Sequence, residues 1–87
     1  SMKAKIYPNP ATDYIWLSPE GGFPHKANDQ VWEVFIYSSD GRQVLYQHSL
    51  VKMAESLQIS ISHLKPGAYV LVAGNRSQRI SGRFIKR

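Results

Sequence analysis

The stretch Leu64-Lys-Pro-Gly-Ala-Tyr-Val-Leu-Val-Ala73 decides the fold class of this chain of 87 residues. Pro66 fixes its own φ and Gly67 accepts a positive one, so the Lys-Pro-Gly segment predicts a tight turn. The run Ala68–Ala73 is apolar on both faces, which is typical of a central strand. Gly74-Asn-Arg-Ser77 predicts another turn, and a basic run follows it. We therefore expect the last third of the chain to be a basic β-hairpin segment.

Strand-like runs also precede this segment. Val31-Trp-Glu-Val-Phe-Ile-Tyr37 is rich in β-branched and aromatic residues and is the strongest strand candidate. The pair Asp40-Gly41 behind it predicts a hairpin turn, because glycine tolerates the positive φ that such turns need. Leu57–Ile61 alternates apolar and polar residues, as a half-buried strand does, and the Pro-Gly turn is predicted to join this run to Ala68–Ala73 in the hairpin segment.

Short strands separated by turns make the predicted fold all-β. Tyr14–Leu17 and Gln43–Gln47 are further strand candidates, whereas Ser18–Gln30 is rich in turn-forming residues and predicts a long irregular loop. This spacing favours an immunoglobulin-like β-sandwich of about seven strands over a fold built from βαβ units. The predicted core consists of apolar residues at inward positions: Trp16, Trp32, Val34, Ile36, Val44, Leu57, Ile59, Ile61, Leu71 and Phe84.

The length and composition fit a single domain. The chain has no cysteine, so disulfides and thiolate metal sites are excluded. No apolar run approaches the ~18 residues of a transmembrane helix, so we expect no membrane insertion. Ser1-Met2 resembles the remnant of an expression tag, so residues 1–5 are predicted to be tag remnant and linker. Residues 6–87 are then expected to be one domain of a longer parent protein, with its other domains upstream.

The formal net charge of +5 is unevenly distributed along the chain. From Arg76 onward every charged residue is basic, and all acidic residues lie earlier. Such a block attracts anionic partners, but it equally suits a strand edge on which Lys and Arg discourage aggregation. On the first interpretation the chain end takes part in binding, and the exposed basic recognition surface consists of Arg79, Arg83, Lys86 and Arg87.

No arrangement of residues indicates catalysis, a metal site or a cofactor. His25, His48 and His63 lack the spacing of metal ligands, and Asp29 and Glu33 do not share a helical face. Neither a nucleophile elbow nor a phosphate-binding glycine loop is present in its proper context. The aromatic residues lie within strand runs, where core packing explains them better than base stacking, so we expect no nucleic-acid partner. The sequence therefore predicts a protein that is not an enzyme.

Several motifs occur in an order that closely resembles a known family. The motifs are Ile6-Tyr-Pro-Asn-Pro-Ala-Thr-Asp13 near the start, Val34–Val44 with its Asp-Gly-Arg turn, Leu64–Leu71, and the closing Gly82-Arg-Phe-Ile-Lys86. This order resembles the C-terminal sorting domain of the type IX secretion system, or Por secretion system, of Gram-negative bacteria of the Bacteroidota group. The resemblance covers Lys5 to Arg87.

The resemblance implies an immunoglobulin-like domain that directs its parent protein from the periplasm across the outer membrane to the cell surface or the medium. The implied partners are an outer-membrane translocon or receptor, a cell-surface sortase that removes the domain, and anionic lipopolysaccharide to which the cargo becomes attached. The opening signal motif maps to Tyr7, Pro8, Asn9 and Pro10, and the C-terminal signal motif to Gly67, Tyr69, Gly82, Arg83, Phe84, Ile85 and Lys86. Pro8 and Pro10 are expected to keep the entry segment extended as a spacer.

Two other functions remain open from the sequence. The domain could be an uncleaved structural or lipopolysaccharide-handling part of a secretion-machinery protein. It could instead be a surface adhesion or carbohydrate-binding module, in which exposed Trp16 or Trp32 would stack on sugar. Homodimerisation through an edge strand is compatible with any of these functions.

Overall fold

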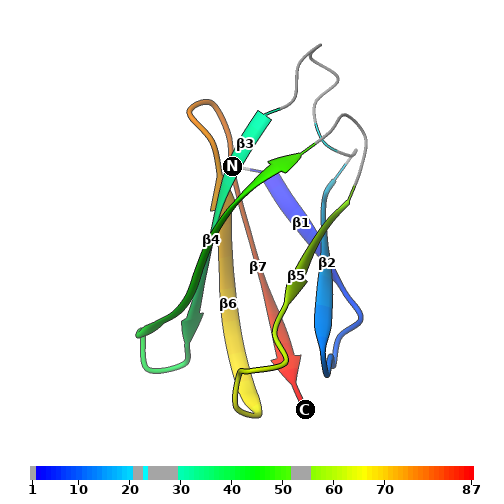
Figure 1. The fold of residues 1–87 in the computed structure, drawn as a ribbon, viewed down its shortest axis with the longest axis vertical. Helices are drawn as coiled ribbons and strands as arrows, with labels where there is room; N and C mark the ends of the chain where they lie inside the picture. Colours follow the sequence, from blue (N-terminus) through cyan, green and yellow to red (C-terminus); the bar gives the residue numbers. More distant parts are fainter. Residues whose placement is uncertain (1, 21–22, 24–29, 52–55) are drawn as a thin grey trace.

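The structure, a computed structural model, describes residues 2–20, 23, 30–51 and 56–87. In this part of the chain every regular element is a strand, and no helix there is long and apolar enough to cross a membrane. The strands follow one another along the chain as shown in Figure 1. They are β1 (Met2–Tyr7), β2 (Tyr14–Pro19), β3 (Gln30–Ser38), β4 (Gln43–Val51), β5 (Leu57–Ser60), β6 (Gly67–Gly74) and β7 (Arg79–Lys86).

The β3–β4 hairpin forms where the Asp-Gly pair predicts a turn. Gly41 has a φ of 85°, which a residue with a side chain rarely adopts, and its N–H donates to the carbonyl of Ser38 at 2.9 Å. The carboxylate of Asp40 accepts hydrogen bonds from the Ser38 hydroxyl and from the backbone N–H of Arg42. These two hydrogen bonds, the Ser38 one foremost, lower the pKa of Asp40. The side chains of the turn therefore hold its backbone closed.

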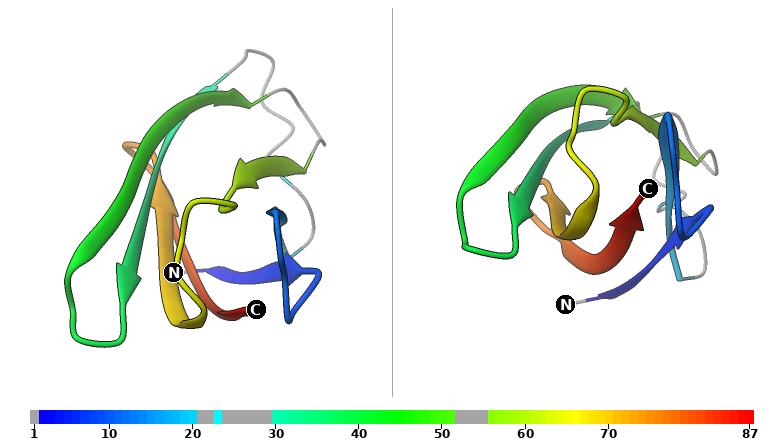
Figure 2. Two further views of the ribbon diagram at one scale, coloured as in Figure 1. Left: turned by 60° about the horizontal axis from the view of Figure 1, so that its bottom comes forward. Right: turned by 90° about the horizontal axis from the view of Figure 1, so that it is seen from below.

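All seven strands belong to one mixed sheet, in the order β4-β3-β6-β7-β1-β2-β5. Neighbours pair antiparallel except β1 and β7, which run parallel. The sheet curls strongly about its long axis, so that the molecule is a nearly closed, barrel-like body (Figure 2). The all-β fold with seven strands is confirmed. The division into two layers of an immunoglobulin-like sandwich is not confirmed, because β1 pairs with both β7 and β2 and thereby joins all strands into one sheet.

The Pro-Gly turn connects two strands that are not neighbours in the sheet. β5 pairs with β2 at one edge, whereas β6 lies between β3 and β7 near the middle. The turn joins these two runs as predicted, but it carries the chain across the sheet instead of back along β5, so the two runs do not pair with each other. The hairpin expected in the last third is confirmed as β6–β7, closed by Asn75, whose N–H donates to the carbonyl of Gln78 at 3.0 Å.

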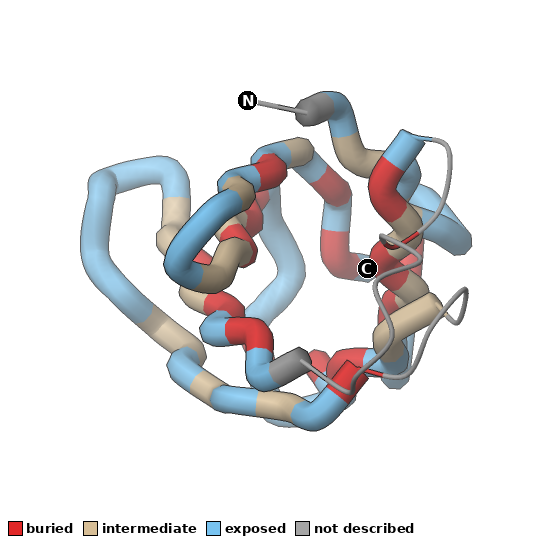
Figure 3. Tube along the Cα trace, turned by 90° about the horizontal axis from the view of Figure 1, so that it is seen from above, coloured by how far each residue is buried: buried red, intermediate tan, exposed pale blue. Residues whose placement is uncertain are grey.

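The core fills the inside of the curled sheet, where buried positions alternate with exposed ones along the strands (Figure 3). Trp32 is fully buried, and its indole packs edge-to-face against Phe23 with ring centroids 5.2 Å apart. The other buried apolar residues are Ala11, Ile15, Leu17, Val34, Ile36, Val51, Ile59, Ile61, Leu64, Tyr69, Leu71, Ala73, Ile80 and Phe84. Every strand except β1 contributes to this list, and Ala4 and Ile6 of β1 pack against it partly buried.

Three predicted core residues lie at its margin. Val44 and Leu57 are only partly buried against the core. Trp16 is half-buried, and its ring contacts Tyr14 edge-to-face at 6.2 Å, because even-numbered positions of β2 face away from the interior. The predicted loop Ser18–Gln30 is shorter at both ends, since β2 continues to Pro19 and β3 begins at Gln30. Residues 2–5, assigned from the sequence to a tag remnant and linker, form part of β1.

Two isoleucines on β7 provide a matched test of this core. Ile80 is fully buried, whereas Ile85 is 46 % exposed on the opposite face of the same strand. We expect Ile80→Ala to lower the free energy of unfolding by about 2–4 kcal/mol through lost burial and a residual cavity. Ile85→Ala should change it by roughly 0.5 kcal/mol or less. Urea unfolding of the two variants measures both values, and equal losses would contradict the assigned faces of β7.

Candidate functional site

The terminal strand β7 has a strand partner along the whole of only one edge. On that edge β6 pairs with it from Gly67 opposite Lys86 to Gly74 opposite Arg79. On the other edge β1 pairs in parallel at its beginning, with Met2 opposite Ile80 and Lys3 opposite Ser81. The second half of this edge, where the C-terminal signal motif lies, therefore needs another source of hydrogen bonds.

The opening motif supplies these hydrogen bonds. The side-chain oxygen of Asn9 accepts from the Ile85 N–H at 2.9 Å, and its amide nitrogen donates to the Arg83 carbonyl at 3.4 Å. One residue beyond Pro10, the Ala11 N–H donates to the Ile85 carbonyl, and the Ala11 carbonyl accepts from the Arg87 N–H, both at 2.8 Å. We call these contacts the Asn9–Ala11 clamp. The clamp joins residues 76 positions apart and makes the two motifs one site.

The entry segment is therefore bent, and the expectation that it is an extended spacer is wrong. Residues 8–10 form bends, and the peptide bonds Tyr7-Pro8 and Asn9-Pro10 are both cis. The segment connects β1 to its antiparallel neighbour β2, so the chain has to reverse direction here. Proline has no N–H to leave unpaired in such a reversal. The two prolines thus shape the loop that presents Asn9 to β7.

Gly82 lets β1 approach β7. A Cβ atom added to Gly82 would lie 2.7 Å from Cδ1 and 3.4 Å from Cγ1 of Ile6. The side chain of Ile6 thus fills the space that any larger residue at position 82 would need. Gly82 of the C-terminal motif and Ile6, directly before the opening motif, are complementary in shape.

Tyr69 and Phe84 lie opposite each other in the β6–β7 ladder and have their side chains on the inner face. Their rings stack with centroids 5.5 Å apart and an interplanar angle of 19°. The Tyr69 hydroxyl donates to the carbonyl of Lys65 at 2.5 Å, so the buried phenol is satisfied and the crossover turn is tied to β6. Gly67 begins β6 with a φ of 155°. These motif residues act as packing and turn residues of the hairpin.

The outer face of β7 carries the exposed basic residues. Arg79, Arg83 and Arg87 are exposed, as expected. The expectation that Lys86 is exposed as well is wrong, because its side chain is only 8 % exposed. It is an even-numbered residue of β7 and so shares the inward face with Ile80 and Phe84. Its Nζ reaches the Arg87 carbonyl at 3.1 Å, so the stem is covered and the charge finds a partner near the chain end.

Sequence reasoning gave no role in this site to Ile6 or Ala11. The sequence does indicate burial of Ile6, because an apolar residue directly before a turn motif is expected to pack against the core. Ala11 takes part only through its backbone N–H and carbonyl, and backbone hydrogen bonding leaves no trace in the identity of a residue. Tyr7 lies outside the clamp, on β1, where its hydroxyl is 3.1 Å from the Ser56 hydroxyl and Lys5 Nζ lies 5.4 Å from its ring.

The chemical groups that could suggest catalysis are dispersed. Among the described residues no group of three potential metal ligands gathers, and His25 and Asp29 lie outside those residues. Glu33 accepts a hydrogen bond of 2.8 Å from the Tyr46 hydroxyl. This hydrogen bond, with some desolvation, raises the pKa of Tyr46, which keeps the phenol protonated rather than activating it as a nucleophile. Burial of Trp32 also removes one of the two indoles proposed for sugar stacking.

The fold and the clamped strand β7 define a small all-β module without a catalytic or metal-binding arrangement among its described residues. Residues 5–87 match the family of the secretion system C-terminal sorting domain, and the chain belongs to this family. It is thus a signal module of the Por, or type IX, secretion system, and membership implies export of a parent protein across the outer membrane. The family is a non-catalytic one.

A solved structure has the same fold. The crystal structure of dimeric latent PorU from Porphyromonas gingivalis matches 95 % of this chain with a TM-score of 0.63 and 17 % sequence identity. This chain spans only 9 % of the length of that PorU chain. No curated protein matches the sequence.

The clamp predicts a local effect of Asn9 substitutions. Asn9→Leu removes the acceptor of the Ile85 N–H, and we expect a loss of about 0.5–1.5 kcal/mol in the stability of the β7 edge. The Ile85 amide should then exchange its hydrogen roughly tenfold faster, since about 1.4 kcal/mol corresponds to a factor of ten. Hydrogen exchange followed by NMR measures this rate.

Asn9→Asp is the matched control, because it keeps the acceptor for Ile85 and loses only the longer hydrogen bond to Arg83. Its Ile85 amide should keep most of its protection. Unchanged exchange at Ile85 in Asn9→Leu would show that the clamp does not hold the strand.

Proposed function

We propose that this chain is the secretion signal of a larger exported protein and acts by being bound. The observation that carries the proposal is the pairing of β7 on both edges, by β6 and by β1 with the clamp. With its backbone groups occupied, β7 has only its outward side chains left for recognition. Arg79, Arg83 and Arg87 are the charged members of that set.

The proposed sequence of events follows the family resemblance. A translocon or receptor of the outer membrane binds the β6–β7 hairpin, and the parent protein passes from the periplasm to the cell surface or the medium. A sortase then removes the domain, and the cargo becomes attached to anionic lipopolysaccharide. Folding of the domain precedes recognition, because the clamp and the basic face exist only once β1 and β7 are adjacent.

The exposed arginines of β7 are proposed to attract an acidic partner. Within the described part of the chain, no carboxylate lies within ion-pair distance of the guanidinium groups of Arg79 and Arg83. Exposed charges of one sign speed the encounter with a partner of opposite charge and reject partners of the same sign. Lys86 is left out of the proposed surface because its side chain is buried.

Charge reversal on β7 tests the proposal in a bacterium that has the secretion system. Residues 2–87 are fused behind a folded reporter, and the secreted and periplasmic amounts are measured. The variant Arg79→Glu with Arg83→Glu should reduce secretion by roughly tenfold or more and leave the reporter in the periplasm, because an acidic partner would be repelled. Deletion of the last residues is less informative, since it removes the buried Phe84 as well.

The control is Arg42→Glu with Lys65→Glu, which changes the net charge equally at two exposed residues that lie in turns away from the outer face of β7. This control should be secreted normally. Equal secretion of both double variants would contradict recognition through β7. Secreted reporter that still carries the domain would show that the domain is retained instead of cleaved.

A further inference from the structure

The basic residues of β7 border an apolar surface that continues across β6 and β3. The strand registers place Tyr37, Val70 and Arg83 in one row across the three strands, and Phe35, Val72 and Ser81 in the next. Ala68 and Ile85 form the row on the other side of Tyr37. All of these side chains belong to the positions that face away from the core. We call this set the outer β3–β6–β7 face.

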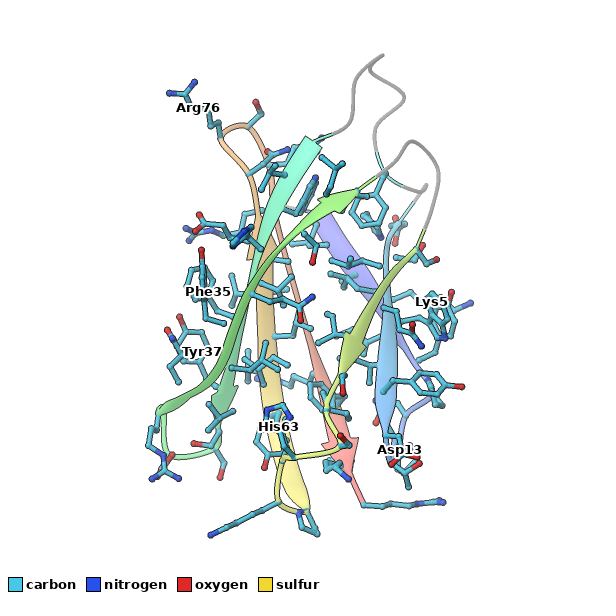
Figure 4. All side chains as sticks on the ribbon, in the orientation of Figure 1. Lys5, Asp13, Phe35, Tyr37, His63 and Arg76 are labelled. Carbon is cyan, nitrogen blue, oxygen red and sulfur yellow. The ribbon has the colours of Figure 1, made fainter. Side chains whose placement is uncertain are left out.

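The centre of this face is aromatic. The rings of Phe35 and Tyr37 stack with centroids 6.4 Å apart and an interplanar angle of 17°, and Phe35 also contacts Tyr46 at 5.1 Å. Figure 4 shows Phe35 and Tyr37 directed away from the barrel. Tyr46 is 47 % exposed and Ile85 46 %. Phe35, Tyr37, Val70 and Val72 between them are partly exposed, and an apolar face of this kind suits contact with another molecule.

A pocket opens in this face between β6 and β7. It has a volume of about 350 Å³ and is lined by Ser39, Ala68, Tyr69, Val70, Arg83, Phe84 and Ile85. The side chains of Tyr69 and Phe84 point to the inner face, so the outward side chains at the pocket are Ser39, the apolar Ala68, Val70 and Ile85, and Arg83. The pocket is therefore suited to an apolar side chain that has an anionic group beside it.

The charges around the pocket specify the partner further. Arg79 and Arg83 lie on this face without a carboxylate partner among the described residues, and Glu33 is engaged by Tyr46. An aromatic and aliphatic centre with arginines beside it is the composition of a protein–protein hot spot. Arginine also binds carboxylates through paired, charge-assisted hydrogen bonds.

We propose that the outer β3–β6–β7 face binds a protein surface that inserts an apolar side chain into the β6–β7 pocket and pairs a neighbouring carboxylate with Arg83. This inference rests on the proposed function, because it assigns the surface by which the secretion machinery holds the signal. It differs from recognition by charge alone in requiring Tyr37, Val70 and Ile85 as well as the arginines.

Secretion of the same reporter fusion tests the surface with matched variants. Ile85→Ser and Arg83→Gln lie on the face, whereas Leu50→Ser and Arg42→Gln make the same changes at exposed residues elsewhere. We expect each variant on the face to reduce secretion at least about tenfold and each control to be secreted normally. Unfolding midpoints of the isolated variants serve to check that all four remain folded.

A second measurement identifies what covers the face. A photoreactive phenylalanine analogue at position 37, with position 14 as the control, should crosslink to a protein segment that carries Asp or Glu beside an apolar residue. Changing that carboxylate to lysine should then restore secretion of Arg83→Glu. Crosslinks from position 37 to polysaccharide, to lipid or to a second copy of this chain would each overturn the proposal.

The two proposals fail in different ways. If the unaltered fusion is not secreted, the proposed secretion signal is wrong. If the fusion is secreted and Ile85→Ser is secreted as well as Leu50→Ser, the signal stands and the assigned surface is wrong.

Discussion

The structure depends on the hydrogen bonds between the Asn9–Ala11 clamp and the edge of β7. A strand with an open edge tends to pair with another molecule. Here the Asn9 side chain and the Ala11 backbone take the place of a neighbouring strand where β1 no longer pairs. Gly82 and Ile6 allow the close approach that this arrangement requires. The clamp extends the edge that β1 begins, and the parallel pairing of β1 with β7 links the two parts of the sheet.

The two faces of β7 have different roles, one in the core and one at the surface. Its inner face, with Ile80, Phe84 and Lys86, belongs to the interior, and its outer face keeps Arg79, Arg83 and Ile85 exposed. The motif residues Tyr69 and Phe84 stack on each other and hold β6 and β7 together. On the proposed function, a signal built in this way is recognised as a folded surface and not as an extended segment. Most of the motif thus builds the surface, while fewer residues are left to contact a partner.

Local patterns in the sequence were sufficient for the family and for every strand except β1, whose first residues were assigned to a tag remnant and linker. Alternation in Leu57–Ile61, the apolar run Ala68–Ala73 and the Asp-Gly turn all predict elements that the structure contains. Alternation also distinguishes the faces of Val31–Tyr37, since Glu33 marks the outer one that Phe35 and Tyr37 share. The outward direction of Phe35 and Tyr37 can thus be predicted from this alternation, although aromatic residues in a strand by themselves favour core packing. The same alternation predicts that Lys86 faces inward with Phe84.

Contacts between distant parts of the chain could not be predicted in the same way. The partner of Asn9 is 76 residues away, and neither residue shows by its type that it pairs with the other. The crossover from β5 to β6 and the single curled sheet likewise depend on which strands meet, which strand periodicity does not specify. The bend at Pro8 and Pro10 could not be predicted either, because it depends on the antiparallel pairing of β1 with β2, which reverses the chain after Tyr7.

Amide hydrogen exchange of the unaltered chain tests most directly whether the terminal strand is closed on both edges. The amides of Ile85 and Arg87 are the ones bonded to the clamp. The account predicts that the Ile85 amide exchanges about as slowly as amides of the central strand β6, such as that of Leu71, with Arg87 also protected. Exchange of the Ile85 and Arg87 amides at the rate of the exposed turn residue Arg76 would contradict it.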